Sequence, residues 1–160
     1  MNDLAGSHAV DKNDEEALVE GAVSLGVPLA PSAARQMLQL RAELLRWNAK
    51  VDLTAITDPG EVLEKHLLDS LSVAPDLPSG ATVLDAGTGA GFPGLPLALA
   101  RPDLKVTLAD SSSRRVAFCK QMVIQLGLSP RVTARDLRLT GHPEREGLST
   151  FDAAVSRAVA

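Results

Sequence analysis

The sequence predicts an α/β fold in which an open parallel β-sheet follows a set of N-terminal helices. Beyond Ala81, short apolar runs alternate with helical patterns, and this alternation requires a parallel sheet with right-handed crossovers. Between residues 83 and 94, the first apolar run passes through an acid into a turn with four glycines in eight residues: Gly87, Gly89, Gly91 and Gly94. Such a turn lets a ligand approach the main chain closely, so the fold class already points to a binding site.

The N-terminal half is expected to be helical. Residues 1–13 are polar, and we expect a disordered tail there. Over residues 14–79 apolar side chains recur at helical spacing, which predicts an N-terminal helical region. One short helix should end near Gly26, and Ser32 can cap the start of a second. A third should begin at Asp58, which is followed by a proline and, three residues later, by an acid.

The second half should form the sheet. Strands are expected at 82–86, 104–109, 131–134 and 152–155, helices at 94–100 and 112–127, and a polar loop at 136–150. With the usual strand order 3-2-1-4, the apolar fourth strand would be an unprotected edge, which soluble proteins avoid. We therefore expect residues 80–160 to form a partial core, truncated after its fourth strand.

Composition limits the functional classes. The chain has 160 residues, of which 45% are hydrophobic and 22% charged, as in a soluble globular domain. It contains neither a long apolar run nor a signal-peptide pattern, so a cytoplasmic location without membrane contact is expected. The single cysteine, Cys119, excludes an internal disulfide and a cysteine-rich metal site.

The net charge of −4 is unevenly distributed. Residues 1–30 carry a balance of −5, so residues 31–160 carry +1, with local clusters of arginine. This balance neither indicates nor excludes a nucleic-acid partner. Aromatic residues make up only 2% of the chain, so a base-stacking platform for single strands is not expected.

The glycine turn has three interpretations. Residues 89–94 match G-x-G-x-x-G, the fingerprint of dinucleotide sites. However, Asp85 precedes the turn and would place a carboxylate where a pyrophosphate comes closest. Asp110 ends the next strand, where it can bind both hydroxyls of a ribose. S-adenosylmethionine carries a sulfonium, an ammonium and a ribose, so a methyl-donor site is favoured over a dinucleotide site or a purely structural turn.

Five motifs follow one another within residues 40–160. They are W-N-A-K-V-D-L-T-A at 47–55, H-L-L-D-S-L at 66–71, D-A-G-T-G-A-G-F-P-G-L-P-L-A at 85–98, L-A-D-S-S-S-R-R-V-A-F at 108–118 and F-D-A-A-V-S-R-A-V-A at 151–160. In this order they closely resemble the RsmG (GidB) family. The resemblance implies a Rossmann-like methyltransferase sheet that uses S-adenosylmethionine to methylate N7 of a guanine in bacterial 16S ribosomal RNA. The partner would be that RNA or the small ribosomal subunit, without DNA or membrane.

The resemblance also implies site residues. Together with Asp85, the expected cofactor-binding set is Gly87, Gly89, Gly91, Phe92, Asp110, Asp136, Leu137 and Arg157. Asp110 would bind the ribose, and the pair Asp136 and Leu137 would lie beside the adenine, with Asp136 in place of a glutamate of the family. Arg157, at the end of the fourth strand, is the candidate catalytic residue, which orients the substrate or holds a phosphate.

Other polar residues allow a structural as well as a functional interpretation. His66 and Asp69 lie three apart on a helical face, but no further metal ligands accompany them, so no metal site is expected. They are either a structural pair or shape the cofactor or RNA pocket, as the resemblance favours. Arg114 and Arg115 contact RNA phosphate or are surface charges.

Three other functions remain alternatives. The chain could be a methyltransferase with a non-RNA substrate, or a truncated cofactor-binding fragment that is inactive or needs a partner to complete its sheet. The third is an NAD enzyme. Titration with S-adenosylmethionine separates these cases.

Overall fold

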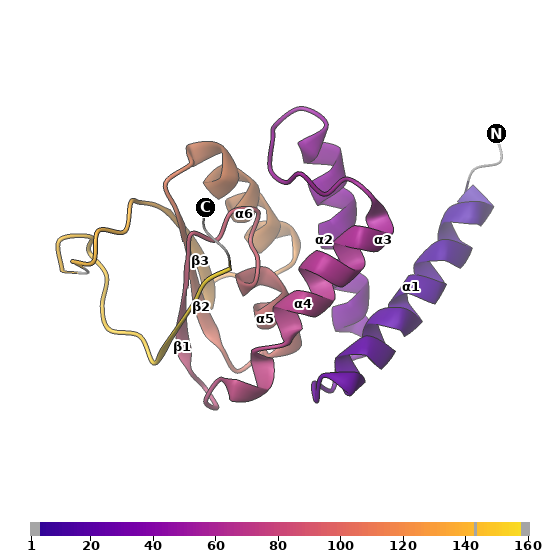
Figure 1. Ribbon diagram of the computed structural model, residues 1–160, viewed down its shortest axis with the longest axis horizontal. Coiled ribbons are helices and arrows are strands. Elements are labelled where there is room, and N and C mark those ends of the chain that lie inside the picture. Colours follow the sequence, from indigo (N-terminus) through magenta and orange to yellow (C-terminus); the bar gives the residue numbers. More distant parts are fainter. Residues whose placement is uncertain (1–3, 143, 158–160) are drawn as a thin grey trace.

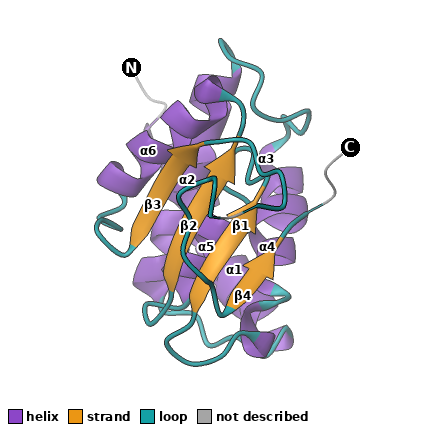
Figure 2. Ribbon diagram, turned by 90° about the vertical axis from the view of Figure 1, so that its left-hand side faces the viewer, coloured by secondary structure: helices purple, strands orange, loops and turns teal. Residues whose placement is uncertain are grey.

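The computed structural model describes residues 4–142 and 144–157, so residues 1–3 of the expected tail and 158–160 of the expected core lie outside it. Its centre is a parallel sheet of β1 (Thr82–Ala86), β2 (Lys105–Asp110), β3 (Val132–Asp136) and β4 (Ala153–Val155). The order β3-β2-β1-β4 confirms the predicted arrangement, with β1 and β2 inside and β3 and β4 at the edges (Figure 2).

The helices lie on one face of the sheet. The connections α5 (Gly94–Ala100) and α6 (Ser113–Gln125) pack directly on it, and the N-terminal helices form an outer layer beyond them (Figure 1). That outer layer comprises α1 (Leu4–Ser24), α2 (Pro31–Asn48), α3 (Pro59–Glu61), the π-helical segment η1 (Val62–Leu68), α4 (Asp69–Leu71) and the 3₁₀ turn η2 (Ala74–Asp76). All of the described helices therefore support the sheet from the same side.

The start of α1 differs from the prediction. The helix begins at Leu4, within the segment where a polar composition predicted a disordered tail over residues 1–13. No proline interrupts residues 4–13, so the main chain continues the helical geometry of the turns that bury Leu18 and Ala22.

The predicted helix starts are partly correct. Asp58 caps α3, because its Oδ2 accepts a hydrogen bond of 2.9 Å from Glu61 N. The prediction for Ser32 is wrong: α2 already begins at Pro31, whose fixed φ suits the first helical position, and the preceding Ala30 makes no side-chain cap.

One hydrophobic core joins the helices to the sheet. Leu18 of α1, Leu40 of α2 and Leu67 of η1 belong to the same buried cluster as Leu108 of β2 and Phe118 of α6. The N-terminal helical region therefore covers the sheet rather than forming a core of its own. None of the described helices combines the length and hydropathy needed to cross a membrane.

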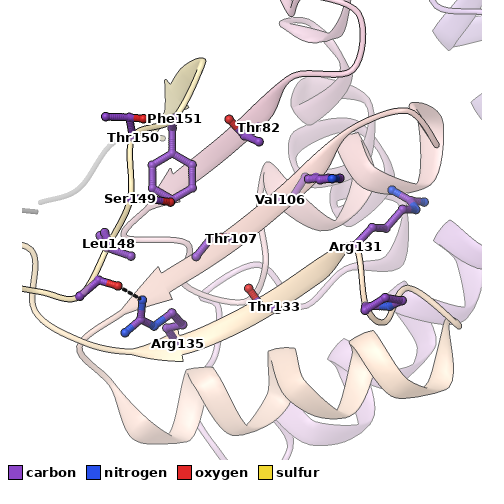
Figure 3. A pocket seen from close by; sticks show the side chains of 13 residues that line it. Thr82, Val106, Thr107, Arg131, Thr133, Arg135, Leu148, Ser149, Thr150 and Phe151 are labelled. Carbon is purple, nitrogen blue, oxygen red and sulfur yellow. Dashed lines mark hydrogen bonds between the residues drawn. The ribbon is translucent and has the colours of Figure 1, made fainter.

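The other face of the sheet carries no helix among the described residues. The loop 137–152 crosses it instead (Figure 2). Between loop and sheet lies a cavity of about 470 Å³, into which Thr107 and Thr133 project while Phe151 closes one side (Figure 3). Arg135 anchors the loop by donating from its NH1 to Gly147 O at 3.0 Å.

Candidate cofactor site

The glycine turn follows β1 directly. Gly87, Gly89 and Gly91 adopt φ values of +68°, +61° and +95°, in a region that side chains rarely tolerate, and no non-glycine residue among those described has a positive φ. A Cβ at Gly89 would meet no atom within 4 Å, so the main chain there borders open space. The backbone at this point is accessible to a ligand.

Gly91 and Gly94 of the turn serve packing. A Cβ at Gly91 would lie 2.3 Å from Leu95 Cδ1, and one at Gly94 would lie 2.2 Å from Leu108 Cδ2. Neither distance is possible between carbon atoms that are not bonded to each other. Gly91 and Gly94 therefore let the start of α5 approach the turn and β2 closely.

Asp110 joins the turn to the end of β2. Its Oδ2 accepts a hydrogen bond of 2.9 Å from Gly89 N, and its Oδ1 accepts one of 2.8 Å from Ser112 N. The residue is 7% exposed. Each carboxylate oxygen keeps a further lone pair, so Asp110 can fix the turn and still accept a hydrogen bond from a ligand hydroxyl.

Asp85 lies beneath the turn rather than facing a ligand. Its side chain is completely buried, and its Oδ2 accepts hydrogen bonds from Thr88 Oγ1 at 2.6 Å and from Gly94 N at 2.8 Å. Burial raises the pKa of this carboxyl to about 7, although both hydrogen bonds oppose the shift. The expected direct contact between Asp85 and a bound cofactor is therefore corrected: Asp85 shapes the turn from inside.

Two cavities lie beside the turn at the carboxyl ends of the strands. One, of about 440 Å³, is lined by Leu53, Thr54, His66, Gly87, Thr88, Gly89, Ala90, Phe92, Asp110, Arg115 and Arg157. The other, of about 420 Å³, is lined by Ala86, Gly87, Ala109, Asp110, Ser111, Arg115, Leu137, Arg138, Leu139 and Ser156. Gly87, Asp110 and Arg115 border both, so the two cavities form adjoining parts of one site. This edge is where open α/β sheets bind their ligands.

The structure thus brings together most of the predicted residues. Lining the cavities are Gly87, Gly89, Phe92, Asp110, Leu137 and Arg157. Asp85 and Gly91 lie below the surface, and Asp136, opposite Asp110 in the β2–β3 register, is exposed and lines neither cavity.

Thr88 and Ser111 also line the site but were not predicted. Their positions were the available signal, since one lies inside the glycine turn and the other follows Asp110.

Thr54, His66 and Arg157 form a polar side of the first cavity. His66 of η1 contacts Thr54 Oγ1 through Nε2 at 2.9 Å and Arg157 NH1 through Nδ1 at 3.1 Å. Its ring stacks on Phe92, with centroids 4.6 Å apart and planes 5° from parallel. Burial and the positive charge of Arg157 lower the pKa of His66 to about 4, so the ring is neutral at pH 7. Within the described chain no three His, Cys, Asp or Glu residues are arranged to hold a metal ion.

A solved structure resembles this fold. It is a protein-L-isoaspartate O-methyltransferase from Plasmodium falciparum in complex with S-adenosyl-L-homocysteine, described as putative. The TM-score is 0.55 at 18% sequence identity, over 92% of this chain and 74% of that one. At this identity the similarity shows a shared fold, in agreement with the Rossmann-like methyltransferase sheet that the family resemblance implies.

Closer relatives are found by sequence. "Ribosomal RNA small subunit methyltransferase G" of Myxococcus xanthus is 50% identical over 144 residues, which are 90% of this chain and 66% of the relative. The protein of the same name from Anaeromyxobacter dehalogenans (strain 2CP-1) is 50% identical over 152 residues, 94% of this chain and 69% of the relative. The chain spans about two thirds of the length of these relatives. Residues 33–160 match the family model GidB, described as rRNA small subunit methyltransferase G, and the chain belongs to this family.

Proposed function

We propose that this chain binds S-adenosylmethionine and transfers its methyl group to N7 of a guanine in bacterial 16S ribosomal RNA. The observation that carries the proposal is the glycine turn clamped by Asp110, within a chain of the GidB family. The bound cofactor would supply a methyl group on a positively charged sulfur, and the bond from N7 to that carbon forms as the carbon–sulfur bond breaks. Gly87 and Gly89 would hold the cofactor along their main chain.

The ends of the ligand can be assigned to residues. Asp110 would accept hydrogen bonds from the ribose hydroxyls, and Leu137, in the adjoining cavity, would pack against the adenine. Asp136 is exposed and lines neither cavity, so Leu137 alone of that pair supports the adenine assignment.

The start of α5 argues against a dinucleotide. In dinucleotide sites the N–H groups at such a helix start bind the pyrophosphate. Here Gly94 N already donates to the buried carboxyl of Asp85 at 2.8 Å. A carboxyl of this chain therefore already uses one of the N–H groups at this helix start, which favours a cofactor without phosphates.

The reaction places few demands on proton transfer. Guanine N7 has an in-plane lone pair and carries no proton, so the methyl transfer needs no general base. The lowered pKa of His66 does not make it a proton acceptor for this step, because Nδ1 already faces Arg157. The site would act by alignment, with Arg157 orienting the base or holding a phosphate.

The partner would be folded RNA in the cytoplasm, as 16S RNA or the small subunit, rather than DNA. Arg114 and Arg115 are exposed at the start of α6, where Arg115 lines both cavities, and they would contact RNA phosphates. The few aromatic residues make binding of bare single strands weak. Equal methylation of a naked, unstructured oligonucleotide and of the small subunit would contradict this partner.

Calorimetric titration with S-adenosylmethionine tests the site. Two glycines with similar backbone geometry provide a variant and its matched control. Gly89 and Gly80 have φ of +61° and +68°, and a Cβ at either would meet nothing within 4 Å. Both G89A and G80A should lower the free energy of unfolding by about 1 kcal/mol through backbone strain. Only G89A should also weaken cofactor binding, by tenfold or more. Equal affinity in both variants would place the ligand elsewhere.

A second candidate is a cofactor-binding chain that methylates only with a partner polypeptide. Among the described residues β4 pairs with β1 alone, and no helix covers one face of the sheet. Cofactor binding without methylation of the small subunit would favour this candidate. Methylation of another substrate, with no methylated nucleoside in the RNA digest, would favour a non-RNA methyltransferase.

A further inference from the structure

The guanidinium of Arg157 is held by the helical segment that faces the glycine turn. Its NH2 donates to Lys65 O at 2.8 Å, its NH1 lies 3.1 Å from His66 Nδ1, and its Nε lies 3.5 Å from Asp69 Oδ2. All three partners belong to η1 and the first residue of α4. The end of β4 is thereby fixed to an element about ninety residues earlier in the chain.

These contacts determine the tautomer of His66. Arginine carries only donors, so Nδ1 must accept the hydrogen bond from Arg157 and cannot carry a proton. The proton of the neutral ring therefore lies on Nε2, which donates to Thr54 Oγ1 at 2.9 Å. Thr54 Oγ1 also accepts a hydrogen bond from Ile56 N, so the oxygen is held by its own loop.

The ring of His66 is also held in its plane. Phe92 of the glycine turn stacks against it, and Ser70 Oγ donates to His66 O on the same helical stretch. This stretch is π-helical, a rare geometry that occurs frequently at functional sites. The imidazole thus connects the turn, the loop at Thr54 and Arg157 in one network.

We propose that His66 is a positioning residue: its unprotonated Nδ1, with Lys65 O and Asp69, fixes Arg157 so that the remaining N–H groups serve the cavity. The guanidinium has five N–H bonds, and NH1 and NH2 each keep one that these contacts do not use. Arg157 lines the cavity with Gly87 and Gly89. The effect on catalysis rests on the proposed methyl transfer, whereas the tautomer and the contact do not.

Protonation of His66 would break the arrangement, because an imidazolium has no acceptor for Arg157. The charged groups around the ring are Arg157 just beyond β4, Asp69 and Lys65 on its own helical stretch, and Asp110 and Arg115 across the cavity. Arg157 lowers the pKa of His66, and Asp69 opposes that shift more weakly.

Nitrogen-15 NMR of the imidazole tests the geometry without any assay of activity. The full chain at pH 7 should show His66 neutral with its proton on Nε2, and titration should begin only below about pH 5. R157A should raise the pKa of His66, because it removes the neighbouring cation. A proton on Nδ1, or a pKa that R157A leaves unchanged, would overturn the proposal.

A double-mutant cycle on methyl transfer tests the consequence. H66F keeps a ring to stack on Phe92 but offers no acceptor, and should lower kcat by about 10- to 100-fold with little change in cofactor affinity. H66N restores an acceptor near the position of Nδ1 and should recover part of the rate. H142N, in the exposed histidine of loop 137–152, is the control and should leave the rate unchanged.

The effect of H66F in the R157A variant decides whether His66 acts through Arg157. In R157A the further substitution H66F should have almost no effect. An undiminished effect there would show that His66 acts by itself and would overturn the positioning role. If the wild-type chain methylates nothing while the NMR result holds, the proposed function fails and the tautomer and contact stand.

Discussion

Two aspartates beside the glycine turn differ in environment because one lies within its strand and the other ends it. Val83 and Asp85 project from the same face of β1, and Val83 is completely buried, so Asp85 is buried as well. Asp110 is the last residue of β2 and reaches the edge of the sheet. Asp110 has the same parity as the buried Val106 and Leu108, so alternation alone does not separate the two aspartates. The sequence predicted both as ligands because both lie beside the turn.

The burial of Asp85 predicts a pH-dependent stability. Burial raises the pKa of the folded carboxyl to about 7 from 3.8, so between these values the folded state binds more protons than the unfolded state. Its contribution to stability is complete below about pH 4 and is lost as pH rises through 7. D85N lacks this titration, so its free energy of unfolding relative to wild type should increase by roughly 1–3 kcal/mol between about pH 4 and pH 8.

Urea unfolding at several pH values measures this difference. Because all other groups are shared, the comparison isolates residue 85. Parallel stability curves for wild type and D85N would mean that Asp85 is ionised in the folded state throughout this range.

Helix geometry was predictable where a local motif defines it. The cap at Asp58 follows from the aspartate, proline and acid in sequence, and the structure confirms it. The π-helical geometry of η1 was not predictable, since its leucines have ordinary helical spacing. It depends on hydrogen bonds such as that from Asp69 N to Glu64 O, in a segment whose His66 contacts Thr54 and Arg157 from other parts of the chain.

A buried ion pair should contribute to the attachment of α1 to α2. Arg41 NH2 contacts Asp14 Oδ2 at 2.6 Å with an arginine side chain only 7% exposed, and Arg41 NH1 donates to Pro59 O at 3.2 Å. D14N would remove the negative charge that this buried guanidinium contacts. We expect a loss of about 1–3 kcal/mol in the free energy of unfolding.

The neighbouring pair on the same helices is the control. Glu15 contacts Arg35 at 3.1 Å, but that arginine side chain is 61% exposed. E15Q should therefore change the free energy of unfolding by no more than about 0.5 kcal/mol. Similar losses in D14N and E15Q, measured by urea denaturation, would argue against a special role for burial.

For the whole molecule, the sheet order and the edge that carries the site followed from the sequence, because alternating strands and helices leave few topologies. The assembly of the site from distant segments did not. Thr54, His66 and Arg157 meet only because the outer helices fold over the carboxyl edge of the sheet, and no local pattern encodes that contact. The division into a helical region at 14–79 and a core at 80–160 stays a prediction, and the hydrophobic core includes residues of both regions.

Unfolding tests that division. Trp47, the single tryptophan, lies on α2 with its ring edge-on to Phe118 of α6, their centroids 5.4 Å apart. Because one core spans both regions, its fluorescence and the far-ultraviolet circular dichroism should change at the same urea concentration. A fluorescence transition at lower urea would show that the helical region unfolds first, as a separate unit.

The π-helical segment also limits how the gene can change. A π-helical hydrogen bond closes over one residue more than an α-helical one, so the segment holds one extra residue between flanking turns of ordinary orientation. Deleting one codon within 62–68 would let the stretch return to α-helical geometry with its flanking turns in nearly the same orientation. The residues inside the segment would shift, and Lys65 and His66 are among them. The contacts to Arg157 therefore depend on the length of this stretch as well as on its side chains.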